Sequence, residues 1–315
     1  MPSKKILVIV GPTASGKTRM AVELAKAHNG EVVSADSMQI YRRMDIGTAK
    51  PTAEEMDGVP HHMIDVADPE EDFSVARYVE MASACVDGIL SRGKLPIVAG
   101  GTGLYVDSLL SGRTFAAFSP DSSLRKELEA ELAERGGEAM LAELSRVDPE
   151  AAARLHPNDH KRIVRALEVY RSTGKTISEH NRETRALPPR YEALTIGLNF
   201  QDRADLWARI DQRVDQMAAA GLEREVRELL SSGLSPRCTA MQAIGYKEFV
   251  AAVEGTMTWR EAEELVKLRS RQYAKRQLTW FRRNPEVHWL LWEKNPNFGN
   301  ARQRSTELLE EFGLG

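Results

Sequence analysis

The residues best suited to chemistry stand near the start of the chain. Residues 8–18 read VIVGPTASGKT, and they match the spacing G-x-x-x-x-G-K-[ST]. Glycines at these places let backbone N–H groups turn toward an anion, a lysine can reach a terminal phosphate, and a threonine hydroxyl can ligate Mg²⁺. The spacing therefore predicts a cradle for a di- or triphosphate, with Thr18 as the metal ligand. The predicted cradle residues are Gly11, Pro12, Thr13, Ala14, Ser15, Gly16, Lys17 and Thr18.

Asp36 is the second candidate. It ends the apolar stretch EVVSAD, which spans residues 31–36. Open α/β sheets place their ligands at the carboxyl ends of strands, where this carboxylate is expected. It could act as a general base, a metal ligand or a hydrogen-bond acceptor, and a turn or capping aspartate is the plainer alternative. Kinases and other NTPases also carry an acidic metal ligand beside the cradle, so Asp36 by itself leaves ATP open as the bound phosphate.

A basic stretch lies near the end of the chain. Between Lys267 and Arg283, seven of seventeen residues are basic and none is acidic, although the whole chain has a net charge of −3. Lysine and arginine supply most of the sequence-independent affinity for RNA, and interleaved aromatic rings can stack on unpaired bases. The stretch predicts an RNA-facing helix, with Trp280 and Phe281 expected to turn into the core.

Alternating strands and helices are predicted to position these groups. Apolar runs with little polar alternation indicate buried strands at 4–10, 31–36, 61–68 and 95–101, and Gly30 is expected to end the first helix. A helix is expected over residues 74–91. This alternation predicts an α/β fold, with a doubly wound, parallel, P-loop NTPase-like sheet as its core.

The pattern changes in the middle of the chain. Only helix-prone segments are found there, and a strand pattern returns at 191–200. We therefore predict a helical insertion over residues 118–187, within a catalytic core of residues 1–117 and 188–315. Further helices and an edge strand at 287–293 are expected toward the end.

Composition restricts the classes of protein. Only two cysteines are present, so neither a disulfide framework nor a cysteine metal site is expected, and a reducing cytoplasm fits best. No apolar run approaches the ~20 residues of a membrane span. Adjacent His61 and His62 have no further ligands at metal-binding spacing and are expected to be structural.

Several segments together resemble a known family, the tRNA dimethylallyltransferases, also called tRNA isopentenyltransferases. The similar segments, in order, are GPTASGKT, ADSMQIYRRMDIGTAKP, VAGGTGLY, QAIGYKE and AKRQLTWFRR. The resemblance implies that the cradle holds dimethylallyl diphosphate with Mg²⁺. It further implies transfer of the dimethylallyl group to N6 of the adenosine directly 3′ of the anticodon, position 37 of tRNA, with release of diphosphate.

The resemblance also implies roles for three residues. Asp36 would be the general base, and Arg213 would contact the donor diphosphate, although a salt bridge to a core carboxylate is an alternative for this arginine. Thr102 would lie near the donor or the target base, and it could equally be the N-cap of a helix. Lys161, Arg162 and Arg165 form a second basic cluster that could grip the other side of a stem-loop.

The partner implied by the family is the anticodon stem-loop of tRNA, bound by a monomer of the bacterial type, without a cysteine-rich extension after Cys238. The residues predicted to contact tRNA are Asp36, Ser37, Met38, Gln39, Lys161, Arg162, Arg165, Gln242, Gly245, Tyr246, Lys247, Lys275, Arg276, Gln277, Trp280 and Arg282.

Three other functions use part of these features. A P-loop kinase for a small metabolite would use residues 8–18 and Asp36, but it would leave the basic helix and the insertion without a role. An adenylate isopentenyltransferase would share the donor, but a free nucleotide acceptor needs neither feature. A nucleotide-gated RNA-binding protein would leave Asp36 and Thr102 unexplained beside the cradle.

Overall fold

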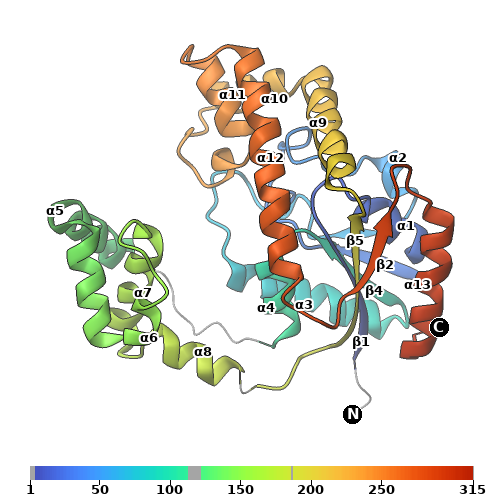
Figure 1. Ribbon diagram of the computed structural model, residues 1–315, viewed down its shortest axis with the longest axis horizontal. Helices are drawn as coiled ribbons and strands as arrows, with labels where there is room; N and C mark the ends of the chain where they lie inside the picture. Colours follow the sequence, from blue (N-terminus) through green and yellow to red (C-terminus); the bar gives the residue numbers. More distant parts are fainter. Residues whose placement is uncertain (1–3, 113–121, 186, 315) are drawn as a thin grey trace. The chain divides into compact units, whose positions relative to one another are not determined.

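The protein consists of two compact units. The computed structural model describes residues 4–112, 122–185 and 187–314. One unit, the core unit, comprises residues 1–110 and 190–315, and the other, the helical unit, comprises residues 111–189 (Figure 1). Residue 118, at which the insertion was predicted to begin, lies outside the described residues.

The core unit is built on a six-stranded sheet in which every pairing is parallel, in the order β3-β2-β4-β1-β5-β6. This confirms the predicted α/β class. The central strand β1 is buried from Ile6 onward, and its Val8 pairs with Val98 and Thr195 on the two neighbouring strands. The strands are β1 Lys5–Val10, β2 Gly30–Ser34, β3 His61–His62, β4 Leu95–Gly100, β5 Glu192–Phe200 and β6 His288–Trp292.

The third strand and the end of the first helix differ from the prediction. The strand predicted over residues 61–68 keeps only His61 and His62, because Met63 and Asp65 have φ values of 63° and 56°, which are incompatible with extended structure. Gly30 opens β2, and the left-handed residue after the first helix is Asn29. The edge strand predicted near the end of the chain is confirmed as β6, which pairs only with β5 among the described strands.

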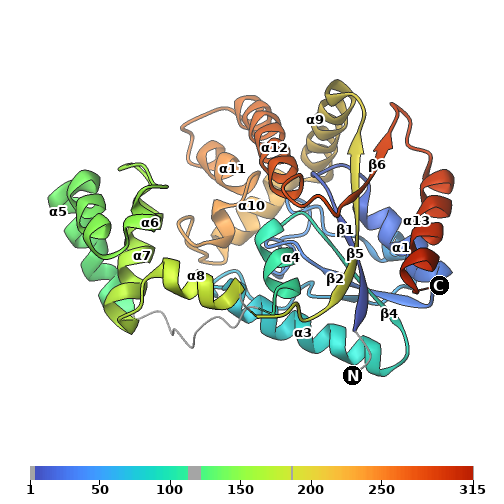
Figure 2. The ribbon, with the colours of Figure 1, turned by 60° about the horizontal axis from the view of Figure 1, so that its bottom comes forward.

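Helices cover both faces of the sheet. α1 and α13 pack together on one side, whereas α3 and α4 pack on β2 and β4 from the other (Figure 2). α12 runs beside α4 and α9. The helices of the core unit are α1 Lys17–Ala27, α2 Ala53–Met56, α3 Val75–Ser91, α4 Gly103–Leu110, α9 Arg203–Ala220, α10 Leu222–Ser231, the 3₁₀ turn η1 Ala240–Gln242, α11 Tyr246–Val253, α12 Trp259–Phe281 and α13 Phe298–Phe312.

Two apolar clusters among the described residues of the core unit bear on the candidate site. The larger joins the sheet to α1 and α13 through residues such as Leu24, Ile196 and Leu309. The smaller joins α9–α12 to the segment that follows β2, where Tyr41 and Met44 are almost fully buried. Burial of this segment brings the residues after Asp36 against helices that lie far along the chain.

The helical unit has its own small core. The helices of this unit are α5 Ser122–Val147, α6 Pro149–Ala152, α7 His160–Thr173 and α8 Ile177–Arg185. Leu128, Met140, Ile163 and Leu167 are buried between α5 and α7. α5 is broken at Gly136, whose φ of 79° interrupts the helical backbone. Among the described residues, no helix has both the length and the apolar composition needed to cross a membrane.

Candidate functional site

The phosphate cradle joins the end of β1 to the start of α1. Left-handed backbone at Ala14 (φ 61°) and Gly16 (φ 87°) bends the loop, as an anion-binding nest requires. A Cβ on Gly16 would lie 2.7 Å from the ring of Phe298, so no larger residue fits there without displacing α13. The Ser15 hydroxyl is buried and has no hydrogen-bond partner among the described residues. The loop therefore has the shape of an anion cradle, and it carries a polar group that no described residue satisfies.

Distant residues hold the cradle in place. The backbone N–H of Thr13 donates to Gln277 Oε1 at 2.9 Å, and Gln277 Nε2 donates to the carbonyl of Gly101 at 3.0 Å. Gln277 on α12 thus links the cradle to the loop between β4 and α4. On the other side, Trp292 Nε1 of β6 donates to the Ser15 carbonyl at 2.8 Å.

Two cations, Lys17 and Arg213, line the cradle cavity, and neither forms a salt bridge among the described residues. Lys17 Nζ donates to the Pro12 carbonyl at 2.7 Å, and Arg213 donates to the Ala49 carbonyl at 3.3 Å. Burial, together with repulsion from Arg213, lowers the pKa of Lys17 to about 7, although Asp36 acts in the opposite direction. Burial also lowers the pKa of Arg213. Within the described part of the chain Arg213 has no salt bridge to a carboxylate, so the expected alternative role for this arginine is not observed.

Asp36 lies just after β2, and only one of its two carboxylate oxygens accepts hydrogen bonds from the described residues. Its Oδ1 accepts from the backbone N–H groups of Met38 at 2.9 Å and Gln39 at 3.4 Å, which is the geometry of an Asx turn. No hydrogen bond of Oδ2 is found among the described residues. The turn therefore orients the carboxylate and leaves one oxygen available to accept a proton.

Thr102 connects the β4–α4 loop to the Asp36 loop. Its Oγ1 accepts from the Ser37 N–H at 3.0 Å and lies 3.3 Å from the Ser37 hydroxyl. The Thr102 carbonyl accepts from the N–H groups of Tyr105 and Val106 in α4, and no capping bond from its hydroxyl to the helix is found in the described part of the chain. Burial, followed by the negative charge of Asp36, raises the pKa of Tyr273 to about 12, although hydrogen bonds to Thr102 and Gln277 act in the opposite direction. Burial and the nearby carboxylate therefore keep Tyr273 protonated at neutral pH.

Two cavities meet at these residues. The cradle cavity, of about 700 Å³, is lined by the loop Thr13–Thr18 and by α9. The adjoining cavity, of about 350 Å³, has apolar walls that include Ile210, Val214, Ile244 and Val266. Asp36, Arg213 and Tyr273 line both cavities. An anion in the first cavity and a planar or apolar group in the second would therefore meet at the Asp36 carboxylate.

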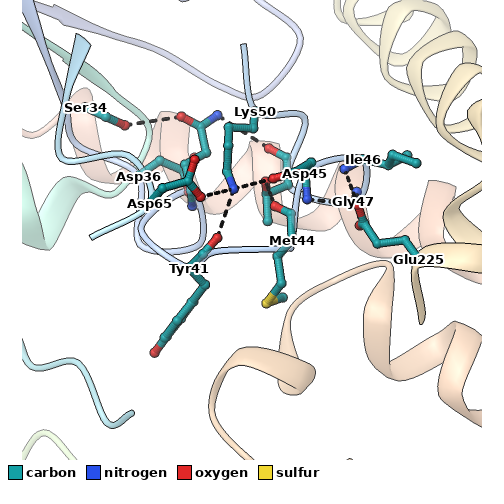
Figure 3. Close-up of polar contacts among 12 residues, drawn as sticks. Ser34, Asp36, Tyr41, Met44, Asp45, Ile46, Gly47, Lys50, Asp65 and Glu225 are labelled. Carbon is teal, nitrogen blue, oxygen red and sulfur yellow. Dashed lines mark hydrogen bonds and ion pairs between the residues drawn. The ribbon is translucent and has the colours of Figure 1, made fainter. Parts of the chain in front are cut away.

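The segment 45–50, which borders both cavities, is anchored by two buried charges (Figure 3). Glu225 of α10 accepts from the N–H groups of Asp45, Ile46 and Gly47 at 2.8–3.1 Å and from the Tyr246 hydroxyl at 2.6 Å. Lys50 donates to the carboxylates of Asp45 and Asp65 and to the Tyr41 carbonyl. The segment is therefore held rigidly before any ligand binds.

We expect Glu225→Gln to loosen this segment. A glutamine offers one acceptor oxygen in place of two, and its NH₂ group would face backbone donors, so the free energy of unfolding should fall by about 1–3 kcal/mol. Affinity for inorganic diphosphate should fall as well, because the segment borders the cradle cavity. Urea unfolding and diphosphate titration measure both effects. The matched control is Glu228→Gln, an exposed carboxylate one turn along α10, and equal stability of the two variants would refute the anchoring role.

Three residues predicted to contact tRNA are buried in the free protein. Tyr246 is fully buried, with its hydroxyl on Glu225 and its ring against Gly47, where a Cβ would lie 2.5 Å from the ring. Gly245 is buried at the start of α11, and both ends of the Gln277 amide have protein partners. We therefore assign these three residues to positioning rather than to direct RNA contact.

The other predicted contacts in the core unit lie on or near the cavities. Ser37, Met38, Gln242, Lys247 and Arg276 line the adjoining cavity, and Gln242, Lys247 and Arg276 are exposed. Gln39 is turned away from it and holds the carbonyls of Thr48 and Ala49 through Nε2. Phe281 is buried, as expected. Trp280 is only half-buried, with its ring beside Gly103 and its Nε1 donating to Asp107 at 2.9 Å, so it does not enter the core as predicted.

The basic stretch on α12 is less one-sided than its sequence indicates. Lys267 is neutralised by three carboxylates, Asp215, Glu263 and Glu264. Arg271 donates through Nη1 to both carboxylate oxygens of Asp211 on α9. Lys275 and Arg282 are exposed and form no ion pair within the described residues. In the helical unit, Lys161 and Arg162 are exposed in the first turn of α7, and Arg165 contacts the buried Glu168 at 2.8 Å.

Sequence reasoning missed several residues of the site. Glu225 lies in none of the quoted segments, Lys50 lies in the segment ADSMQIYRRMDIGTAKP but was given no role, and Tyr273 is one of the aromatic rings interleaved in the basic stretch. The spacing of Tyr273 and Gln277 by one helical turn could have indicated a shared face, but not that this face meets the cradle. Among the described residues, no cluster of three histidine, cysteine, aspartate or glutamate side chains forms a metal site.

Family models and similar proteins all point to transferases of isopentenyl or dimethylallyl groups. The family model described as IPP transferase matches residues 39–284, and that described as isopentenyl transferase matches residues 4–70. The chain is 50% identical to a tRNA dimethylallyltransferase of Acetivibrio thermocellus over 285 residues, which cover 90% of this chain and 91% of the relative. It is also 50% identical to the corresponding protein of Geobacter sulfurreducens, covering 98% and 97% of the two chains.

Solved structures show the same relationship. The full-length tRNA isopentenylpyrophosphate transferase from Bacillus halodurans matches with a TM-score of 0.73 and 44% identity, covering 98% of this chain and 97% of that one. A eukaryotic dimethylallyltransferase acting on tRNA matches with a TM-score of 0.84 and 31% identity, covering 98% and 79%.

Proposed function

Since the chain belongs to the IPP transferase family, whose similar members are named tRNA dimethylallyltransferases, we propose that it transfers a dimethylallyl group to tRNA. The donor is dimethylallyl diphosphate, and the acceptor is N6 of the adenosine 3′ of the anticodon. One observation carries the proposal: Asp36 stands where the cradle cavity joins a second cavity. A kinase that binds only ATP and a small metabolite has no need of the basic α12 beside that junction.

The cradle is suited to a leaving diphosphate. As the allylic C–O bond breaks, negative charge grows on the departing oxygen, and preorganised cations stabilise it best in a site poor in water. Lys17 and Arg213 supply two such charges, and neither has a carboxylate salt bridge among the described residues. The unfavourable proximity of the two cations in the free protein is relieved when the anion binds, so this part of the site favours a diphosphate.

Asp36 completes the transfer. The N6 lone pair forms a bond to C1 of the dimethylallyl group, the C1–O bond breaks, and the electron pair leaves with the diphosphate. The proton of N6 passes to the free oxygen of the Asp36 carboxylate. The Asx turn fixes the other oxygen, and Thr102 fixes the Ser37 backbone next to it, so the base is held in one orientation.

The residues present are compatible with Mg²⁺. This ion prefers oxygen ligands and keeps several waters when it is shared with phosphates, and the cradle cavity offers the Thr18 hydroxyl and the Asp36 carboxylate. When bound, Mg²⁺ would neutralise part of the diphosphate charge.

Exposed polar and basic groups are proposed to hold the anticodon stem-loop. In the core unit these are Gln242, Lys247 and Arg276 at the rim of the adjoining cavity. In the helical unit they are Lys161 and Arg162 on α7. The target base must leave its stack to reach Asp36, and phosphate contacts can offset that cost of a few kcal/mol.

Prenyl transfer can be tested directly with the purified chain. Incubation with Mg²⁺, labelled dimethylallyl diphosphate and unmodified tRNA should place label in tRNA, and AMP and ATP offered as acceptors should stay unlabelled. Label in free nucleotide would instead identify an adenylate prenyltransferase. ATP hydrolysis without prenyl transfer would show that the cradle holds ATP and would refute the proposal.

The dissociation constant of the donor should depend on pH through Lys17. The pKa of this ammonium in the free protein is about 7, whereas a bound diphosphate favours the charged form. Donor binding therefore takes up a proton above pH 7, and the dissociation constant should rise by up to about tenfold per pH unit between pH 7 and 9. Isothermal titration across this range measures the slope. Lys17→Arg should flatten the slope, because arginine stays charged throughout; an equal slope in both proteins would contradict the assignment to Lys17.

A further inference from the structure

A third cavity lies between α9 and α12, away from the site described above. We call it the α9–α12 groove; its volume is about 390 Å³, and it borders the end of β5. It shares no lining residue with the cradle cavity or the adjoining cavity. The groove therefore serves neither the diphosphate nor the base that receives the prenyl group.

All charged side chains that line the groove are basic. Four of its fourteen lining residues are basic, Arg203, Arg271, Lys275 and Arg282, and none is acidic. Arg271 is neutralised by Asp211, but the other three have no ion pair within the described residues. In a chain of net charge −3, such a concentration of unpaired cations indicates an anionic ligand.

The same groove is apolar and aromatic at its surface. Trp207 is 39% exposed and Leu268 is 43% exposed, two of the few large apolar side chains that reach solvent in the described residues. The guanidinium of Arg203 lies 4.6 Å from the centre of the Trp207 ring. An arginine paired with an indole offers planar surfaces on which a nucleobase can stack.

A buried acceptor without a partner stands at the inner end of the groove. Asn199 of β5 is 5% exposed and lines the groove, and no described residue hydrogen-bonds to its Oδ1. A buried polar atom left unpaired costs stability. A ligand that brings an N–H group, as a nucleobase does, would satisfy this oxygen.

We propose that the α9–α12 groove binds an unstacked nucleotide of the tRNA other than the adenosine that is modified. Its phosphate contacts Arg203, Lys275 and Arg282, its base stacks on Trp207, and a base N–H group donates to Asn199. The inference rests on the proposed function, because it takes tRNA as the polyanion that α12 meets. A nucleotide, with one anionic group and one planar face, matches all three features, whereas an acidic peptide would leave the exposed ring and the amide unused.

The test compares tRNA binding and prenyl transfer in the full-length protein. Trp207→Ala should raise the dissociation constant for unmodified tRNA by about tenfold, the scale of one lost base–aromatic stack, with kcat at saturating tRNA unchanged. Trp207→Phe keeps a ring and should restore most of the affinity. Leu291→Ala, which truncates another exposed apolar side chain outside the groove, should bind tRNA like the wild type.

Asn199→Leu gives a readout that a purely structural role would not produce. The variant removes an unpaired buried acceptor, so its melting temperature should stay equal or rise, while tRNA binds several-fold more weakly. Wild-type affinity in both Trp207→Ala and Asn199→Leu would overturn the inference, provided that the wild type labels tRNA; failure of the wild type to label tRNA would refute the proposed function instead. AMP binding that is lost in Trp207→Ala, with tRNA affinity unchanged, would assign the groove to free nucleotides and overturn the assignment to tRNA.

Discussion

Replacing Asp36 with asparagine is expected to lower kcat for prenyl transfer by about 10²- to 10⁴-fold, the usual contribution of a general base. Asparagine keeps a side-chain oxygen that can accept from the Met38 N–H, so the Asx turn should survive. Only the proton acceptor is removed, and the melting temperature and the dissociation constant for tRNA should change little. Single-turnover transfer of labelled dimethylallyl groups measures the loss.

The control for this substitution is Asp57→Asn. Asp57 is an exposed carboxylate with left-handed backbone, which asparagine tolerates, and its only ion pair in the described residues is with Lys26. It should leave kcat unchanged. If Asp36→Asn kept wild-type kcat, the base would have to be another group. If excess Mg²⁺ restored its activity, Asp36 would be a metal ligand rather than a base.

Replacing Arg213 with glutamine is expected to lower kcat/KM for dimethylallyl diphosphate by about 10²- to 10³-fold, comparable to the loss of one preorganised donor at a developing anion. The free protein should not become less stable. Arg213 is a cation in a confined site whose only hydrogen bond in the described residues goes to the Ala49 carbonyl. The carboxylates of Asp36 and Glu55 offset its burial only in part, so removing this charge relieves a desolvation cost.

The same substitution should raise the pKa of Lys17 above 7, because repulsion from Arg213 contributes to its depression. The pH dependence of donor binding should then move to higher pH in Arg213→Gln, which isothermal titration can follow. Arg224→Gln, an exposed arginine on α10, is the control and should match the wild type in every measurement. Reduced tRNA affinity with unchanged donor affinity in Arg213→Gln would contradict the role given to Arg213.

Much of the site could be predicted because its signals are local in sequence. The cradle depends on glycines and a lysine within eight residues, at a place where one strand runs directly into one helix. Asp36 was predicted for a similar reason, since a buried apolar strand places the next polar side chain at the carboxyl edge of the sheet. The parallel α/β class followed from the alternation of apolar runs and helices. The pattern of apolar residues did not predict where β3 ends, because that strand stops at His62 before the left-handed Met63.

Residues on long helices were predicted less well. Glu263 and Glu264, one turn before Lys267, could be read from the sequence as its partners, but the third carboxylate, Asp215, comes from α9. No comparable sequence signal distinguishes the exposed Lys275 from the buried Gln277 two residues on. Tyr246 was expected on an RNA surface and is instead a buried support for Gly47. Which side of a helix meets solvent is decided by the elements packed against it, and those lie far away in the chain.

By itself, the sequence predicted a phosphate cradle at the end of a buried strand with a carboxylate beside it, and it placed the chain with enzymes that modify tRNA. Only the tertiary structure decided which side chains hold that site open. Gln277 reaches Thr13 across 264 residues, and Glu225 binds three successive N–H groups from 178 to 180 residues away. Such contacts leave no local pattern, because they depend on how helices α9–α12 pack against the segment after β2, and that packing is a property of the whole folded chain.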